Sequence, residues 1–245
     1  MTNLRLLDTF SGIGGFSLAA RWLGGFETVA FVERDPFCQQ ILRKHWPNVP
    51  IHHDITTFAP KPDSADVICG GFPCQDISTA GKQAGIKQGT RSGLFYELMR
   101  VVRVVGPRFV VLENVSAILG NGMDSVLGEL ADAGFDAEWA CIPASALGAC
   151  HQRDRWWLVA YPNRERWSQQ QLSTLASDQR WASRGDDARQ LDPDWRSFLS
   201  EPILRRGDDG LSGRVDRIKA LGNAVVPQVA MIPLRRVLEL ASPCA

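Results

Sequence analysis

Cys74 stands where an apolar stretch of the chain gives way to a turn. The run Gly-Gly-Phe-Pro-Cys-Gln occupies residues 70–75, directly after the hydrophobic residues 66–69. Such a pattern is typical of a strand that ends in a tight loop, so the thiol is expected at a strand end. An ionised thiol in that place can act as a nucleophile. Taken alone, the same pattern also fits a structural cysteine.

A carboxylate, Glu113, follows the apolar residues 109–112 in the same way. Ligands of a doubly wound sheet bind at the carboxyl ends of its strands, so Glu113 and Cys74 are expected at one edge. A thiol beside a carboxyl group that can stay protonated suits covalent catalysis with acid assistance. Taken alone, Glu113 fits better as a carboxylate that caps the following helix.

A glycine-rich turn and two further acids indicate a nucleotide-type pocket. The turn contains Gly12, Gly14 and Gly15 and follows the first apolar stretch, residues 4–10. Glycines allow a close backbone approach, and a following helix lends amide donors. Glu33 and Asp54 end the next two strands, where carboxylates can accept bonds from ribose hydroxyls and an adenine amino group. These features favour an adenosine-containing cofactor, although acids at strand ends are often merely solvated or cap a helix. The chain has no GxxxxGK[ST] run, which argues against ATP hydrolysis.

The elements that must position these groups alternate between strand and helix. This alternation predicts an α/β fold, a doubly wound and mostly parallel sheet. Strands are expected at residues 4–10, 28–33, 51–55, 66–69, 109–112, 135–141 and 156–161, and helices at residues 15–23, 36–46, 94–105, 123–133 and 224–240. Periodicity weakens after residue 162. We therefore expect a catalytic and cofactor-binding domain at 1–162, a separate region at 163–213 and a C-terminal segment at 214–245 that returns to the first domain.

Composition limits the partners and the compartment. Lysine plus arginine and aspartate plus glutamate each total 27, so the net charge is zero and any binding of nucleic acid must come from local patches. The six cysteines form no CxxC pair and show no metal-ligand spacing, so no metal is expected. No apolar run is long enough to span a membrane, and no signal peptide is recognised. We expect a cytoplasmic protein with reduced thiols.

In this order the motifs resemble the C5-cytosine-specific DNA methyltransferase family, whose members use S-adenosylmethionine. The resemblance covers nearly the whole chain. The matching segments are residues 8–15 (Asp-Thr-Phe-Ser-Gly-Ile-Gly-Gly), Glu33, Asp54, residues 71–75 (Gly-Phe-Pro-Cys-Gln), 93–95 (Gly-Leu-Phe), 113–115 (Glu-Asn-Val), 152–155 (Gln-Arg-Asp-Arg) and 221–225 (Leu-Gly-Asn-Ala-Val).

The resemblance implies a Rossmann-like methyltransferase fold and a set of site residues. The catalytic residues would be Cys74, Glu113, Arg153 and Arg155. The residues that bind S-adenosylmethionine would be Phe10, Gly12, Gly14, Gly15, Glu33, Asp54, Phe72, Pro73, Asn223 and Ala224. A loop that closes on DNA would contribute Gln75, Ser78, Lys82 and Arg91.

The mechanism implied by the resemblance is covalent. Cys74 would add to C6 of a cytosine that is flipped out of double-stranded DNA, and Glu113 would hydrogen-bond and protonate N3. Arg153 would position the Glu113 carboxylate, and Arg155 would bond the cytosine O2. The family also implies a monomer and a restriction-modification or phage setting with a cognate restriction endonuclease as partner.

The match weakens in one region. Family members usually carry a sizeable target-recognition domain before the last motif, whereas only the region 163–213, with its arginines and tryptophans, is available here. Such a small, reduced recognition region leaves two alternatives open, a tRNA cytosine-C5 methyltransferase on the same scaffold and a weakly active or non-catalytic DNA-binding relic. DNA is preferred to tRNA because Phe72 precedes Pro73 and no Cys-Phe-Thr run is present.

Overall fold

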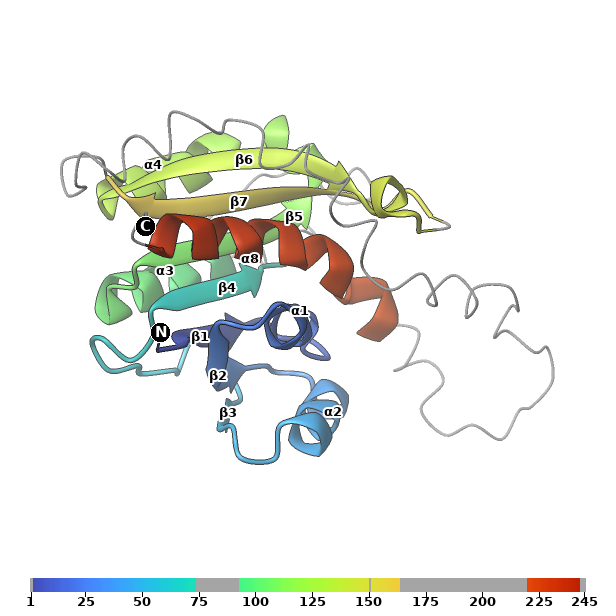
Figure 1. The fold of residues 1–245 in the computed structure, drawn as a ribbon. Helices are drawn as coiled ribbons and strands as arrows, with labels where there is room; N and C mark the ends of the chain where they lie inside the picture. The colour runs from blue at the N-terminus through green and yellow to red at the C-terminus, as the bar shows by residue number, and fades with distance from the viewer. Residues whose placement is uncertain (1, 74–92, 150, 164–219, 243–245) are drawn as a thin grey trace.

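The chain folds around one seven-stranded sheet in the order β3-β2-β1-β4-β5-β7-β6 (Figure 1). The computed structural model describes residues 2–73, 93–149, 151–163 and 220–242. The strands are β1 (Leu4–Thr9), β2 (Phe26–Val32), β3 (Ile51–His52), β4 (Val67–Gly71), β5 (Phe109–Val115), β6 (Phe135–Pro143) and β7 (Asp154–Pro162). The α-helices are α1 (Gly15–Leu23), α2 (Pro36–His45), α3 (Leu94–Val105), α4 (Met123–Asp132) and α8 (Pro227–Ala241), and the short 3-10 helices are η1 (Ser116–Leu119) and η2 (Ala144–Leu147).

The connections place a ligand crevice at the middle of the sheet. Strands β3, β2, β1, β4 and β5 are mutually parallel, whereas β7 pairs antiparallel with both β5 and β6. The chain builds outward from β1 to β2 and β3, and then crosses back so that β4 lies on the other side of β1. A parallel sheet opens a crevice at the carboxyl ends of its strands where the strand order reverses in this way. The expected doubly wound, mostly parallel α/β fold is confirmed.

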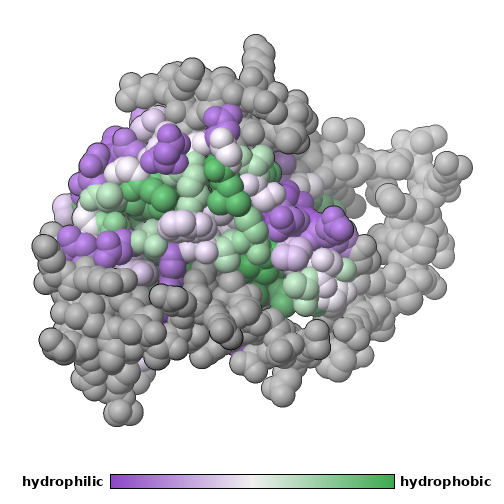
Figure 2. All heavy atoms as spheres, turned by 90° about the horizontal axis from the view of Figure 1, so that it is seen from above, coloured by the Kyte–Doolittle hydropathy of each residue, from purple (hydrophilic) through white to green (hydrophobic). Residues whose placement is uncertain are grey.

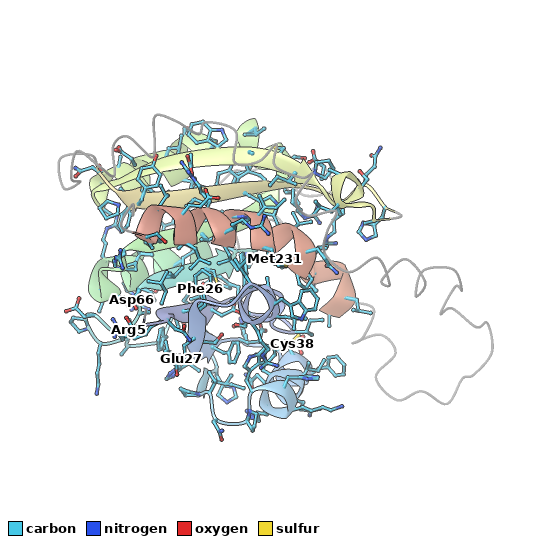
Figure 3. All side chains as sticks on the ribbon, viewed as in Figure 1. Arg5, Phe26, Glu27, Cys38, Asp66 and Met231 are labelled. Carbon is cyan, nitrogen blue, oxygen red and sulfur yellow. The ribbon has the colours of Figure 1, made fainter. Side chains whose placement is uncertain are left out.

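Two hydrophobic cores lie on the two faces of the sheet. Successive residues of a strand point to opposite faces, so Leu6 and Cys69 belong to one core while Leu7 and Ile68 belong to the other. Helices α1 and α8 cover the first face, where Phe26 and Met231 belong to the same core (Figure 3). Helices α3 and α4 cover the second face. Buried on both sides, the central strands are continuously apolar, as the sequence shows.

Charged pairs tie the sheet together away from its carboxyl ends. Asp66, directly before β4, accepts bonds from the Arg5 backbone N–H at 2.8 Å and from its guanidinium Nε and Nη2 at 3.0 Å each (Figure 3). Arg236 of α8 is only 1% exposed and pairs with Glu138 of β6 at 2.6 Å. These contacts align β1 with β4 and fasten α8 across the last strands.

Strand β6 forms one edge of the described sheet, opposite β3. Seen from above, hydrophobic residues lie among hydrophilic ones on this side of the molecule (Figure 2). Trp139 of β6 is 45% exposed, and Cys141 of the same strand is an exposed free thiol. The strand is therefore much less buried than its neighbour β7. Across the described ranges, no helix has the length and the hydropathy needed to cross a lipid bilayer.

Several element bounds differ from those expected. Strand β3 contains only two residues, because the Asp54 side chain accepts bonds from Thr56 and turns the chain at once. Strand β5 continues to Val115, so Glu113 lies inside a strand and does not cap a helix. Helix α8 begins at Pro227 and not at residue 224, as suits a proline, which lacks a backbone N–H. Of the expected region 163–213, all but residue 163 lies outside the described residues.

Candidate active site

A cavity of about 670 Å³ opens at the carboxyl ends of β1, β2, β4 and β5. A volume of this size is typical of sites that hold a small molecule or a cofactor. Its lining includes Phe10, Gly12, Glu33, Asp54, Phe72, Pro73, Glu113, Arg153, Arg155 and Asn223 among the residues predicted from the sequence. The strand ends and the segment before α8 thus bring together residues that lie more than 200 positions apart in the chain.

Glu33 and Asp54 form an acidic end of this cavity. Glu33 accepts a bond from the backbone N–H of Gly12 and another from that of Asp35, both at 2.7 Å. Burial raises the pKa of Glu33, while these amide donors oppose the rise. The backbone and hydroxyl donors of Thr56 lower the pKa of Asp54. The acidic end therefore offers one more basic and one less basic carboxylate to a ligand.

The glycine turn lines the cavity with some of its residues and packs against neighbouring elements with others. Phe10 has a φ of 50° and Gly12 a φ of 54°, and both residues line the cavity. Non-glycine residues with positive φ are uncommon and are concentrated at functional sites. Gly14 and Gly15, which were expected to bind the cofactor, are absent from the described lining of this cavity.

Close packing explains these two glycines. A Cβ on Gly14 would lie 2.8 Å from the Trp46 ring, and one on Gly15 would lie 2.6 Å from the backbone oxygen of Val225. Gly14 and Gly15 therefore let α2 and the C-terminal segment approach the turn. A direct role for either glycine in cofactor binding stays a prediction.

Glu113 lies at the other end of the cavity, in an ion pair with Arg155. The Arg155 Nε is 3.0 Å from Oε1, and the Glu113 side chain is only 12% exposed. Burial raises the pKa of Glu113, while Arg155 and Arg153 act in the opposite direction. Gly71 faces Glu113 across the β4–β5 pair, where an added Cβ would lie 2.9 Å from Oε2. The carboxyl group can thus hold a proton more readily than an exposed glutamate.

Arg153 has a different contact from the one expected. Its guanidinium donates to the backbone oxygens of Gly222 at 2.9 Å and Ala224 at 2.6 Å, whereas Arg155 makes the ion pair with Glu113. The expected role of Arg153, to position the Glu113 carboxylate, stays a prediction: its charge lowers the pKa of Glu113, while its hydrogen bonds go to the C-terminal segment. The backbone supplies the reason: Arg153 has a φ of 34°, which breaks the regular alternation of side chains just before β7. Ala224 contributes its carbonyl to this contact and is absent from the described lining of the cavity.

Asn114 is a site residue for which the sequence analysis gave no role. It is 2% exposed, and its Nδ2 donates to the backbone oxygen of Phe72 at 3.1 Å. Phe72 and Pro73 line the cavity at the end of β4. The signal in the sequence was an amide side chain directly after Glu113 in an otherwise apolar strand. Asn114 thus holds the backbone two residues before Cys74.

Some predicted residues cannot be placed. Cys74 and the expected loop residues Gln75, Ser78, Lys82 and Arg91 lie outside the described residues. Within the described ranges, no group of three or more histidine, cysteine, aspartate or glutamate side chains is arranged to hold a metal ion.

Comparison with known proteins identifies the sequence family. A sequence model of the family described as C-5 cytosine-specific DNA methylase matches residues 4–196. The chain is 35% identical to the Type II methyltransferase M.CviJI of Paramecium bursaria Chlorella virus IL3A over 163 residues, which are 64% of this chain and 43% of that protein. It is 32% identical to M.HhaI of Haemophilus parahaemolyticus over 169 residues, which are 66% of this chain and 50% of that one. The chain thus spans about half the length of the curated relatives that it matches.

Solved structures share the fold. A putative DNA modification methyltransferase encoded within an E. coli prophage is 25% identical, with a TM-score of 0.52, over 65% of this chain and 47% of that one. A DNMT2 variant from Spodoptera frugiperda is 14% identical, with a TM-score of 0.64, over 98% of this chain and 100% of that one. At such low identity the second likeness concerns the fold alone.

Proposed function

The chain belongs to the C-5 cytosine-specific DNA methylase family, and from this premise we propose that it transfers a methyl group from S-adenosylmethionine to C5 of cytosine in DNA. One observation carries the proposal: a single cavity joins the acidic pair Glu33 and Asp54 to the buried Glu113–Arg155 ion pair. The first pair suits a nucleoside, and the second suits a base that needs a proton donor.

The acidic end of the cavity fits S-adenosylmethionine. Glu33 is proposed to accept bonds from the ribose hydroxyls, and Asp54 from the adenine amino group. Phe10 offers an aromatic face beside the glycine turn, and Asn223 closes the cavity from the C-terminal segment. When bound, S-adenosylmethionine supplies an electrophilic methyl group. The carboxylates, the ring and the glycine turn hold and orient it.

The other end of the cavity fits cytosine. The Cys74 thiolate is proposed to form a bond to C6, which makes C5 nucleophilic. Glu113, whose pKa is raised by burial, would donate a hydrogen bond and a proton to N3, so that negative charge does not accumulate on the ring. After the methyl group has moved to C5 and left S-adenosylhomocysteine behind, loss of the C5 proton to a base would re-form the C5–C6 double bond and expel the Cys74 thiolate, while N3 would return its proton to Glu113. Arg155, which pairs with Glu113 and lines the cavity, is proposed to orient that carboxyl group and to bond the cytosine O2.

Double-stranded DNA is the proposed substrate. A cytosine within a duplex is stacked and paired, so it must be flipped into the cavity before Cys74 can reach C6. The expected loop residues Gln75, Ser78, Lys82 and Arg91 are proposed to contact the DNA during this step. A monomeric enzyme that acts beside a cognate restriction endonuclease remains our proposal for the biological setting.

The decisive experiment is a methylation map. The purified chain is incubated with S-adenosylmethionine and unmethylated genomic DNA, and 5-methylcytosine is mapped at base resolution. We expect methylation within one short sequence motif, and none with the Cys74→Ala variant. The matched control is Cys141→Ala, which removes an exposed thiol on β6 and should leave the activity unchanged. Equal methylation by Cys74→Ala and wild type would refute the covalent mechanism.

A second variant tests the acid. Replacing Glu113 by glutamine keeps a hydrogen-bond donor but removes the transferable proton. We expect the rate of a single turnover to fall by about 10²–10⁴-fold, with little change in DNA affinity. A loss of DNA affinity at an unchanged rate would move Glu113 to a binding role.

Transfer RNA is assayed in parallel, and methylation of RNA alone would favour the tRNA methyltransferase.

A further inference from the structure

His53 lies at the acidic end of the cavity and is held there by a buried amide. Its side chain lines the cavity together with Glu33 and Asp54. The Nδ1 atom of its ring is 2.9 Å from Nε2 of Gln39, a residue of α2 that is only 1% exposed. Neither His53 nor Gln39 belongs to the motifs that resemble the family.

The partners of Gln39 determine which way its amide points. The Nε2 atom donates to the backbone oxygen of Glu33 at 2.6 Å, and the Oε1 atom accepts from Arg43 Nη2 at 3.0 Å. A carbonyl oxygen can only accept and a guanidinium can only donate, so the two ends of the amide cannot be exchanged. The amide nitrogen therefore faces His53.

This orientation determines the tautomer of His53. Gln39 donates through Nε2, so His53 Nδ1 must accept and carries no proton. The neutral ring then carries its hydrogen on Nε2. His53 thus presents an N–H donor to a cavity end whose carboxylates, Glu33 and Asp54, are acceptors.

An imidazole N–H beside two carboxylates matches a purine base, and Arg34 also lines this end of the cavity. Adenine offers an amino group as a donor and ring nitrogens as acceptors, so a site built only of carboxylates would leave the ring nitrogens without partners. We propose that His53 Nε2–H donates a hydrogen bond to a ring nitrogen of the cofactor's adenine, and that Gln39 positions His53 for this contact. This role rests on the proposed function, because it requires S-adenosylmethionine in the cavity.

The test measures binding of S-adenosylhomocysteine, which is unreactive, to the full chain by isothermal titration calorimetry. We expect His53→Ala to weaken binding by roughly threefold to tenfold, the range for one lost hydrogen bond. The matched control is His52→Ala. His52 is the adjacent histidine and is exposed, as His53 is, but its ring packs on Phe58 with centroids 4.5 Å apart and the residue does not line the cavity within the described residues. We expect this control to bind as wild type does.

Analogues distinguish a direct contact from a structural effect. Three forms of S-adenosylhomocysteine are used, in which CH replaces N1, N3 or N7 of the adenine. The wild type should bind one of the three analogues more weakly than S-adenosylhomocysteine, by about the same factor as the His53→Ala substitution weakens the binding of S-adenosylhomocysteine. In His53→Ala that analogue should lose nothing further, because the two changes remove the same bond.

Different failures have different meanings. The role of His53 is wrong, while the proposed function stands, if His53→Ala binds S-adenosylhomocysteine as the wild type does. It is also wrong if each analogue loses the same factor in affinity in His53→Ala as it loses in the wild type. If the wild type does not bind S-adenosylhomocysteine at all, both the proposed cofactor and this role are overturned.

Discussion

Asp8 of β1 carries a carboxyl group that is buried beneath the glycine turn and accepts few hydrogen bonds. Its Oδ2 accepts from the hydroxyl of Ser17 at 2.7 Å and from the backbone N–H of the same residue at 3.2 Å. Its Oδ1 has no hydrogen-bond partner in the described part of the chain. Burial raises the pKa of Asp8 to about 7. A structural acid beneath the site therefore changes charge near neutral pH.

This raised pKa predicts a dependence of stability on pH. Below a pH of about 4, Asp8 is protonated in both the folded and the unfolded chain, so its contribution is fully present. As the pH rises towards 7, the unfolded chain releases the proton first and the folded state loses stability, by about 4 kcal/mol at most. The Asp8→Asn variant has no proton to lose. We expect its free energy of unfolding, measured in urea at about pH 5 and about pH 8, to fall less than that of the wild type. Equal falls in both proteins would contradict the burial effect.

The two arginines before and within β7 are expected to give separable phenotypes. Arg155→Lys keeps the charge beside Glu113 but changes the fork geometry, so the rate of a single turnover should fall by roughly tenfold. Arg153→Lys should instead raise the dissociation constant of S-adenosylhomocysteine by roughly tenfold, since two bonds to the C-terminal segment are lost. Single-turnover reactions that are quenched at set times measure the rate, and isothermal titration calorimetry measures the dissociation constant. The assignment of roles would be wrong if both substitutions acted only on the rate.

At the scale of elements, α1 packs so closely against the C-terminal segment that no side-chain atom fits between them at Gly15. A Cβ on Gly15 would meet the backbone oxygen and the Cβ of Val225, at 2.6 and 2.9 Å. Because the segment that includes Gly222 and Asn223 closes the cavity, a displaced Val225 changes the site without touching any ligand. The element contact between α1 and the chain before α8 therefore helps to set the shape of the cavity.

Gly15→Ala is accordingly expected to weaken cofactor binding by tenfold or more, on the order of 1.4 kcal/mol. The control is Gly128→Ala in α4, where an added Cβ meets nothing within 4 Å. Alanine there should stabilise the helix by about 0.5–1 kcal/mol and leave cofactor affinity unchanged. Calorimetry and urea unfolding of both variants test the contrast. Normal affinity in Gly15→Ala would show that the segment can shift without cost to the site.

At the scale of the whole molecule, the cavity joins the two ends of the described chain. Phe10 and Gly12 line it together with Ala220, Gly222 and Asn223, so a ligand connects the end of the first strand to the chain before the last helix. A ligand that binds only the folded state adds its binding free energy to stability. Cofactor binding should therefore raise the free energy of unfolding of the whole fold rather than that of one part.

Thermal unfolding tests this response. At about one hundred times its dissociation constant, S-adenosylhomocysteine should add about 2.7 kcal/mol to the free energy of unfolding. For a chain of this size the midpoint should rise by roughly 5–10 °C. Glu33→Ala, which removes the proposed ribose contact, should show a smaller rise at the same ligand concentration. A rise equal to that of the wild type would argue against the ribose role of Glu33.

The sequence by itself determined the fold class and most of the cavity's predicted residues. Short continuous apolar stretches bounded by turn residues are typical of strands buried on both faces, and their alternation with helical patterns favours a mostly parallel sheet. Because ligands collect at the carboxyl ends of such strands, Glu33, Asp54 and Glu113 could be assigned to one edge of the sheet from the sequence, and all three line the cavity. These inferences need only local periodicity and chain order.

Only the tertiary structure decided which groups touch. The pairing of Glu113 with Arg155, and of Arg153 with carbonyls 69 and 71 positions away, depends on a left-handed backbone at Arg153 and on the packing of a distant segment. The donor role of His53 depends on an amide buried in a neighbouring helix. Contacts between residues far apart in sequence follow from the packing of whole elements, and no local pattern encodes which side chains meet there.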